Sequence, residues 1–150
     1  MTFSIVGYDP DEQAWGIAVA SKFLAVGSVV PWAQADAGGI ATQAWANMSY
    51  GFNGLPLLAE GKSAEETLQI ILANDPETIK RQVGIVDRQG NSAAFTGANC
   101  MDWAGHKTGQ NYACQGNILT GEETLDAMID NFLNTKGELT VRQMAARVEG

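Results

Sequence analysis

The sequence predicts an α+β domain in which helices pack outside antiparallel sheet. Three observations support this prediction. Strand patterns follow one another across short turns, helical patterns occur in the middle and at the end, and there is no strand–helix alternation with a GxGxxG motif. The 150 residues have the length of one domain, so we expect residues 1–150 to form a single unit.

The first third of the chain is rich in strand patterns. Four segments are predicted to be strands: 2–7, 14–20, 26–35 and 39–45. The first two form a predicted hairpin, because Asp9 and Pro10 occupy a turn between them. In the second strand Trp15, Ile17 and Val19 share one face, and small residues line the other.

The rest of the chain alternates between helical and hairpin patterns. A loop leading into a short helix is expected at 49–58, which contains Gly51, Gly54 and Pro56. Ser63 and Glu66 form a capping box that opens the next helix. Four further elements are predicted: a hairpin at 82–96, a loop at 104–109, a strand at 111–119 and a helix at 121–134. This helix has apolar residues at helical spacing on one face: Leu125, Met128, Ile129, Phe132 and Leu133. A last helix is predicted to open with a capping box of Thr140 and Gln143, beside a staple of Leu139 and Met144.

Charge and composition exclude several classes of partner. The net charge of −8 repels phosphate backbones, so we expect no nucleic-acid partner. The uncharged run from Ala37 to Ala59 is interrupted by Gly, Pro, Asn and Gln, so we expect no membrane span. No basic region precedes an apolar run at the start, and we expect a cytoplasmic protein with reduced thiols.

A long stretch of the chain lacks charge. Asp36 is the only charged residue between Lys22 and Glu60. A segment so depleted is either buried on both faces or buried in a subunit contact. We therefore expect a homo-oligomer.

The start of the chain offers a nucleophile. Methionine is commonly removed when a small residue follows it, and removal here would make Thr2 the N-terminus. Such a threonine carries a hydroxyl nucleophile and an α-amine base, whose reference pKa is about 7.7–8.0. The alternative is an ordinary threonine at the start of a strand.

Five segments together resemble a known but uncharacterised bacterial and archaeal family that is described as N-terminal-nucleophile-hydrolase-like. These segments are Thr2–Val6, Ser21–Gly27, Thr42–Asn47 with Tyr50–Gly51, Trp103–His106 and Gln115–Asn117. The resemblance covers residues 2 to about 130 and implies a four-layer αββα sandwich of the N-terminal-nucleophile type. Family members usually continue beyond the last helix into another strand, so we expect this domain to be incomplete at its C-terminus.

Several polar residues are candidates for a site around Thr2. Ser21 could relay a proton, and Lys22 could lower the pKa of the α-amine. Candidate oxyanion or substrate contacts are Gln43, Asn47, His106, Gly116 and Asn117. The alternative is a solvated lysine at a strand end for Lys22, a surface histidine for His106, and a structural role in a loop, turn or bulge for the others.

We predict no metal and no cofactor. The spacing of Cys100, His106 and Cys114 fits no common zinc pattern. Cys100 as a nucleophile would need His106 as its base, and nothing else in the sequence supports that pair.

Two hypotheses for function follow. In the first, Thr2 attacks the carbonyl of a small or peptide-like amide substrate and uses its own α-amine as base. In the second, the same scaffold is a non-catalytic binding or assembly protein that uses the charge-poor surface in a homo-oligomer.

Overall fold

The computed structural model describes residues 1–149 and contains two four-stranded antiparallel sheets. The strands are β1 (Thr2–Asp9), β2 (Ala14–Ser21), β3 (Pro31–Gln34), β4 (Gly38–Ala44), β5 (Arg81–Asp87), β6 (Ser92–Thr96), β7 (Gly105–Gly109) and β8 (Tyr112–Asn117). One sheet has the order β2-β1-β8-β7, and the other has the order β3-β4-β5-β6. The N-terminal strand β1 is therefore a central strand, bonded on both sides.

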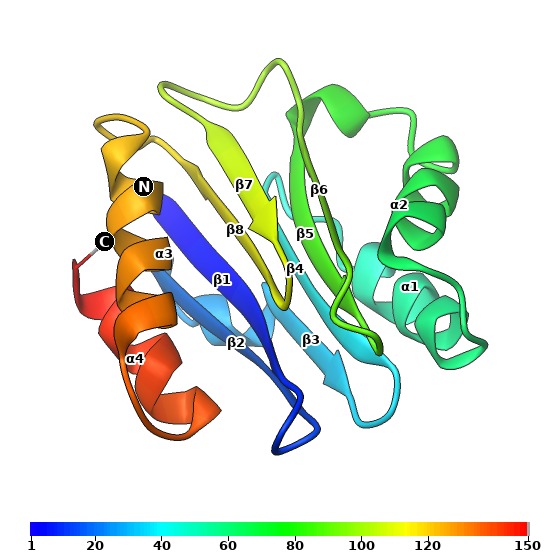
Figure 1. Cartoon of the computed structure of the whole chain (residues 1–150). Helices are drawn as coiled ribbons and strands as arrows, with labels where there is room; N and C mark the ends of the chain where they lie inside the picture. Colours follow the sequence, from blue (N-terminus) through cyan, green and yellow to red (C-terminus); the bar gives the residue numbers. More distant parts are fainter. Residues whose placement is uncertain (150) are drawn as a thin grey trace.

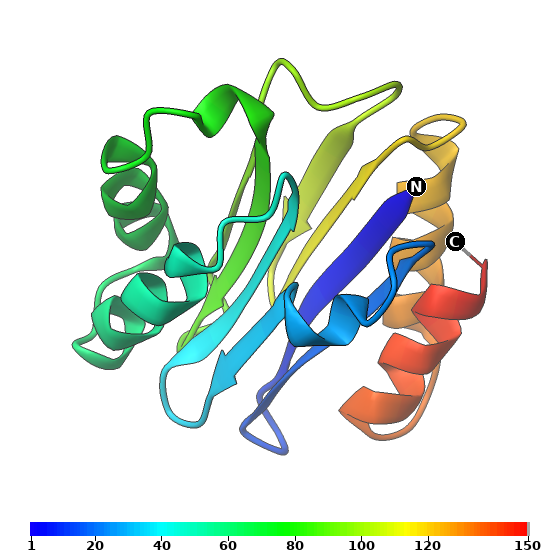
Figure 2. The ribbon, with the colours of Figure 1, turned by 180° about the vertical axis from the view of Figure 1, so that it is seen from behind.

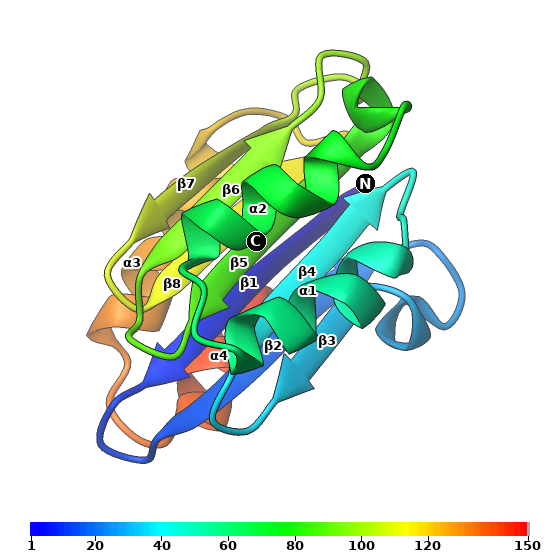
Figure 3. The same ribbon diagram turned by 90° about the vertical axis from the view of Figure 1, so that its right-hand side faces the viewer.

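Helices cover the outer face of each sheet. They are α1 (Ser49–Ala59), α2 (Ala64–Ala73), α3 (Glu123–Asn134) and α4 (Leu139–Glu149), with 3₁₀ turns η1 (Val26–Ser28) and η2 (Thr78–Lys80). Figure 1 shows the two sheets facing each other, with α3 and α4 outside the β1 sheet and α1 and α2 outside the β4 sheet. Figure 3 shows α1 and α2 from the front, lying across the second sheet. No helix in residues 1–149 is long and apolar enough to span a bilayer.

Three apolar clusters hold these layers together. One lies between the first sheet and its helices and includes Ile5, Leu125 and Phe132. A second lies under α1 and α2 and includes Ile40 and Ile85. The third lies between the sheets and is formed by Val6, Val30, Ala41, Val86 and Ala113. Because side chains alternate along a strand, β1, β2, β4, β5 and β8 each contribute to two clusters.

The N-terminal hairpin has the predicted arrangement. Trp15, Ile17 and Val19 pack against the cluster between the sheets, whereas Ala18 and Ala20 pack against the helix-side cluster. The small face of β2 lets α4 approach closely, since a Cβ at Gly16 would lie 2.4 Å from Oε1 of Gln143.

Two predicted helices also agree with the structure. The Ser63 side chain accepts from the Glu66 backbone, and the Glu66 side chain accepts from the Ser63 backbone, which is the predicted capping box. In α3, Leu125, Met128, Ile129 and Phe132 are buried as the apolar spacing predicts, whereas Leu133, the last residue of that spacing, is exposed.

The segment predicted as a loop before a short helix is a complete helix, α1. Gly51 and Gly54 favour a loop in the sequence, but in the structure they allow α1 to pack closely on the sheet. A Cβ at Gly51 would lie 2.0 Å from the Trp32 ring, and one at Gly54 would lie 2.5 Å from Ile40. Pro56 lies inside the helix, so it supplies no backbone N–H there.

Three other predictions are wrong in detail. The strand predicted at 26–35 is only Pro31–Gln34, because Ala25 adopts a left-handed conformation and the η1 turn follows it. The segment predicted as a loop at 104–109 is the edge strand β7, which pairs with β8. Its sequence is polar and rich in glycine, so it does not look like a strand. The last helix begins at Leu139, so Thr140 lies within it and cannot form the predicted cap. Leu139 is buried and Met144 is exposed, so they do not form the predicted staple.

Candidate functional site

A pocket of about 620 Å³ opens at one end of the two sheets. At this end β1 and β5 begin, and β2, β4 and β8 finish. The antiparallel order explains this convergence, because the start of a strand lies beside the end of its neighbour. Figure 2 shows the start of β1 and the segment after β2 on the same side of the molecule.

Thr2 forms part of the pocket wall. It is the first residue of β1, and its register partners are Ser21 on β2 and Asn117 on β8. Thr2 Oγ1 lies 2.8 Å from Ser21 Oγ, and Ser21 Oγ also donates to the Met1 carbonyl at 3.2 Å. Because Ser21 has one hydroxyl proton, Thr2 is the donor in their shared bond. The Thr2 hydroxyl is therefore oriented by Ser21.

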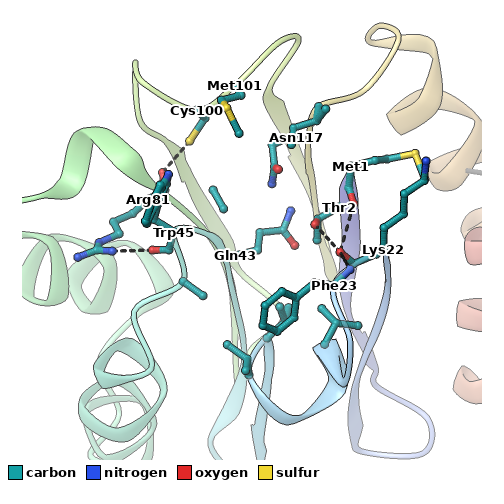
Figure 4. A pocket seen from close by; sticks show the side chains of 17 residues that line it. Met1, Thr2, Lys22, Phe23, Gln43, Trp45, Arg81, Cys100, Met101 and Asn117 are labelled. Carbon is teal, nitrogen blue, oxygen red and sulfur yellow. Dashed lines mark hydrogen bonds between the residues drawn. The ribbon is translucent and has the colours of Figure 1, made fainter.

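Lys22 also lines the pocket, immediately after β2 ends. Its side chain is exposed, and Figure 4 shows it on the same side of the pocket as Thr2. The charged residues in the pocket wall are Lys22 and Arg81, so this wall is positively charged.

Gln43 and Asn117 lie in the pocket wall as well, and a buried network connects them. Gln82, which sequence analysis did not single out, is fully buried at the centre of this network. Its Oε1 accepts from Gln43 Nε2 at 2.8 Å and from Asn117 Nδ2 at 2.9 Å. Its Nε2 donates to the carbonyls of Gly116 at 2.7 Å and Gly105 at 3.0 Å, and to Thr96 Oγ1 at 3.0 Å. These donations fix which end of the Gln82 amide faces Gln43 and Asn117.

The network separates the roles of the two pocket amides. Gln43 Oε1 accepts from Ser4 at 2.6 Å, and its Nε2 donates to Gln82 and to the Gln115 carbonyl. Both of its N–H groups are therefore in use. Asn117 Nδ2 has two N–H groups and donates one to Gln82. Within the described residues the other has no protein acceptor, so Asn117 is the better oxyanion candidate.

Three of the residues singled out in the sequence do not line the pocket. Asn47 lies beyond the end of β4, where its Nδ2 donates to Asp75 Oδ2 at 2.8 Å and its Oδ1 accepts from Ser49. His106 lies on β7, and its Nδ1 is 2.8 Å from Thr96 Oγ1. Gly116 faces the helix layer because it is adjacent to Asn117 in the strand, and a Cβ there would lie 2.4 Å from Leu119.

An ion pair supports one wall of the pocket. Arg81 donates through Nε to Asp75 Oδ2 at 2.8 Å and through Nη1 to the Trp45 carbonyl at 2.6 Å. Tyr50 and Asn47 also donate to Asp75 Oδ2. The Arg81 guanidinium holds the pKa of Asp75 well below its ordinary value, with smaller contributions from these hydrogen bonds. The cluster fixes the loop that presents Trp45 to the pocket.

Because of Asp75, the free energy of unfolding should depend on pH in the acid range. Its pKa is lowered on folding, so its contribution is complete above about pH 4 and is lost as the pH falls further. We expect Asp75→Asn to destabilise the fold by about 3 kcal/mol at pH 7, because it leaves Arg81 without its buried carboxylate partner. Urea unfolding from pH 7 to pH 2 should show a smaller loss of stability in the variant than in the wild type. Equal losses would show that Asp75 is not coupled to folding.

The pocket thiol is not paired with the histidine. Cys100 donates to the Arg81 carbonyl at 3.3 Å, whereas His106 is bonded to Thr96. Burial raises the pKa of the Cys100 thiol, which disfavours the nucleophilic thiolate. Among the described residues, no three His, Cys, Asp or Glu side chains are grouped so that they could hold a metal ion.

Two strand ends at the pocket have unusual backbone conformations. Ala44 follows Gln43 with φ of 65°, and Ile118 follows Asn117 with φ of 56°. A β-branched residue in this left-handed region is a genuine outlier, and such conformations concentrate at functional sites. The sequence gives no signal for either, since both positions look like ordinary apolar strand residues.

Comparison with known proteins places the chain in a family. A sequence model for a family of unknown function, DUF1028, matches residues 2–150. The fold is similar to the crystal structure of a Silicibacter pomeroyi protein that is described by the same family, with a TM-score of 0.94 and 32% sequence identity. The match covers 99% of this chain and 69% of that chain. No curated protein matches the sequence. The chain therefore belongs to the DUF1028 family, whose function is unknown.

Proposed function

We propose that this protein is an N-terminal-nucleophile hydrolase of amide-type bonds, with Thr2 as the nucleophile. The observation that carries the proposal is the Thr2 hydroxyl in the pocket wall, bonded to Ser21 and in register with Asn117. The two facing sheets with a helix pair outside each are consistent with the αββα layers of such enzymes. Family membership leaves the activity open, so the chemistry rests on the pocket.

The mechanism requires removal of Met1. The α-amine of Thr2 then takes the proton of the Thr2 hydroxyl as Oγ1 bonds to the amide carbon. The tetrahedral intermediate collapses as the carbon–nitrogen bond breaks, and the ammonium gives its proton to the leaving amine. Water, activated by the same amine, then hydrolyses the acyl-threonine ester and releases the acid.

Three neighbours have roles in this proposal. Asn117 donates its remaining N–H to the oxyanion. Ser21 orients the Thr2 hydroxyl. With Met1 present, the Ser21 hydroxyl donates to the Met1 carbonyl, and removal of Met1 makes this proton available for another bond. Lys22 adds positive charge to the wall near Thr2, which favours the neutral amine at neutral pH.

The first test combines mass measurement with a substrate panel. We expect the intact mass of the native protein to lack Met1, and we expect the processed protein to hydrolyse members of a broad panel of acyl amides. Complete retention of Met1 would block the amine and exclude this mechanism.

Asn117 supplies a prediction that is specific to the oxyanion. We expect Asn117→Ala to lower kcat by about 10²–10³, because it removes the donor that stabilises charge in the transition state. KM should change little, since the contact strengthens only as the charge develops. Steady-state kinetics on the best panel substrate measures both quantities. Asn91→Ala, on an exposed turn outside the pocket, is the control and should keep wild-type kcat.

A second candidate function is that of a non-catalytic oligomeric binding protein. It is favoured by the exposed apolar side chains at the pocket, which include Phe23, Trp45 and Met101. Sedimentation distinguishes the candidates. An oligomer that retains Met1 and hydrolyses no amide would support the assembly protein, and a monomer with Thr2 at its N-terminus would count against it.

A further inference from the structure

The pocket has two chemically different ends. Figure 4 shows Thr2 and Lys22 on one side and Trp45, Cys100 and Met101 on the opposite side, with Gln43 between them. The first end presents hydroxyls and an ammonium. The second combines the apolar side chains of Trp45 and Met101 with the Arg81 guanidinium, whose charge is paired with Asp75. A ligand that fills both ends must therefore be amphiphilic.

The charge of the pocket is opposite to that of the chain. The protein has 17 acidic and 9 basic residues, yet no acidic residue lines the pocket, whereas Lys22 and Arg81 do. Arg81 is already bound by Asp75, at 2.8 Å. Lys22 has no carboxylate within 4.0 Å among residues 1–146, and it can therefore pair with an anionic group on a ligand.

The opposite end leaves large apolar side chains uncovered. Trp45 is 63% exposed and Met101 is 61% exposed, although both line the pocket. The cavity of about 620 Å³ is within the range of small-molecule sites, which are mainly apolar with a few polar groups that fix orientation. An acyl chain that lies against these side chains would remove them from water.

We propose that the substrate is an N-acylated amino acid. This inference rests on the proposed function. The acyl chain lies toward Trp45 and Met101, the scissile amide lies at Thr2, and the carboxylate of the amino acid pairs with Lys22. Hydrolysis consumes one water and yields a carboxylic acid and a free amino acid, so no other reactant is needed.

Binding to a protein without the nucleophile tests the ligand class. Thr2→Ala is titrated calorimetrically with N-butanoylglycine, N-hexanoylglycine and N-octanoylglycine, and with the glycinamide of each. Intact mass establishes that all variants have the same N-terminus. We expect each added methylene to tighten binding about fourfold until the apolar end is filled. We expect each acid to bind about two- to fivefold more tightly than its amide at low salt, and less so at high salt.

Two variants separate the ends of the pocket, each in the Thr2→Ala background. Lys22→Met should abolish the preference for the acid and keep the dependence on chain length, whereas Lys22→Arg should keep both. Trp45→Ala should reduce the gain in binding affinity per added methylene. Leu24→Ala is its matched control, because Leu24 is 91% exposed in the neighbouring loop and does not line the pocket.

The outcomes distinguish this inference from the proposed function. One outcome is that Thr2→Ala binds the acids more tightly than the amides while the wild type hydrolyses none of these compounds. That result would support N-acylated amino acids as ligands and reject the proposed hydrolase activity. The ligand class would be overturned, and the hydrolase kept, if the wild type hydrolyses acyl amides but Thr2→Ala binds the acids no more tightly than the amides. The same conclusion would follow if Lys22→Met in the Thr2→Ala background kept the preference for the acid. Failure of Thr2→Ala to bind any of the six compounds would also overturn the ligand class.

Discussion

Thr2→Ala is expected to lower amide hydrolysis at least about a thousandfold, because it removes the hydroxyl that forms the acyl intermediate. The fold should persist. Thr2 is partly exposed at the edge of the sheet, and its side chain makes one hydrogen bond, to Ser21 Oγ. Losing that bond should cost about 1 kcal/mol. Activity against the best substrate of the panel and urea unfolding measure the two effects separately.

Thr2→Ser is the matched control. Serine keeps a hydroxyl and an α-amine at the same position, so it should retain measurable turnover. Ser21→Ala keeps the nucleophile but removes the group that orients it, and its effect on kcat should lie between those of the two Thr2 variants. Wild-type turnover in Thr2→Ala would exclude Thr2 as the nucleophile.

Gln82→Met is expected to cost about 3 kcal/mol or more of folding free energy. Methionine has a similar size, so the change removes polar partners with little change in packing. Gln82 donates to the carbonyls of Gly105 and Gly116, and it accepts from Gln43 and Asn117. Each buried group that loses its partner costs about 1–3 kcal/mol. Thermal unfolding should show a Tm lower by roughly 6–12 °C.

Gln69→Met provides the comparison for this effect. Gln69 is exposed on α2, where it donates to Glu65 four residues earlier. Its replacement should change stability by less than about 0.5 kcal/mol. Equal stabilities of the two variants would show that the buried amide network does not stabilise the fold. Gln82→Met should also lower kcat, because Asn117 loses the acceptor that orients its amide.

Much of the fold could be predicted from patterns that are local in sequence. The Ser63 capping box, the apolar stripe of α3 and the two faces of β2 are each set within a few residues, and each agrees with the structure. The missed elements depend on distant partners. Gly51 lies in a helix because the absence of a side chain lets that helix pack on Trp32. The segment β7 is a strand because it pairs with β8.

The same distinction applies to the candidate site. Thr2, Ser21 and Lys22 could be singled out because they lie at the two ends of one hairpin, which the sequence predicts. Gln82 could not, because its importance comes from bonds to residues on other strands, such as Gln43 and Asn117. Strand alternation alone would have separated Asn117 from Gly116, since neighbouring residues face opposite layers.

Covalent trapping can identify Thr2 as the nucleophile. The native protein is treated with an acylating β-lactone probe, digested and mapped by mass spectrometry. We expect an N-terminal peptide that begins at Thr2 and carries one probe, and no labelling of Thr2→Ala. A labelled peptide elsewhere in the chain, such as the one containing Cys100, with an N-terminal peptide that begins at Met1 and is unmodified, would contradict this expectation.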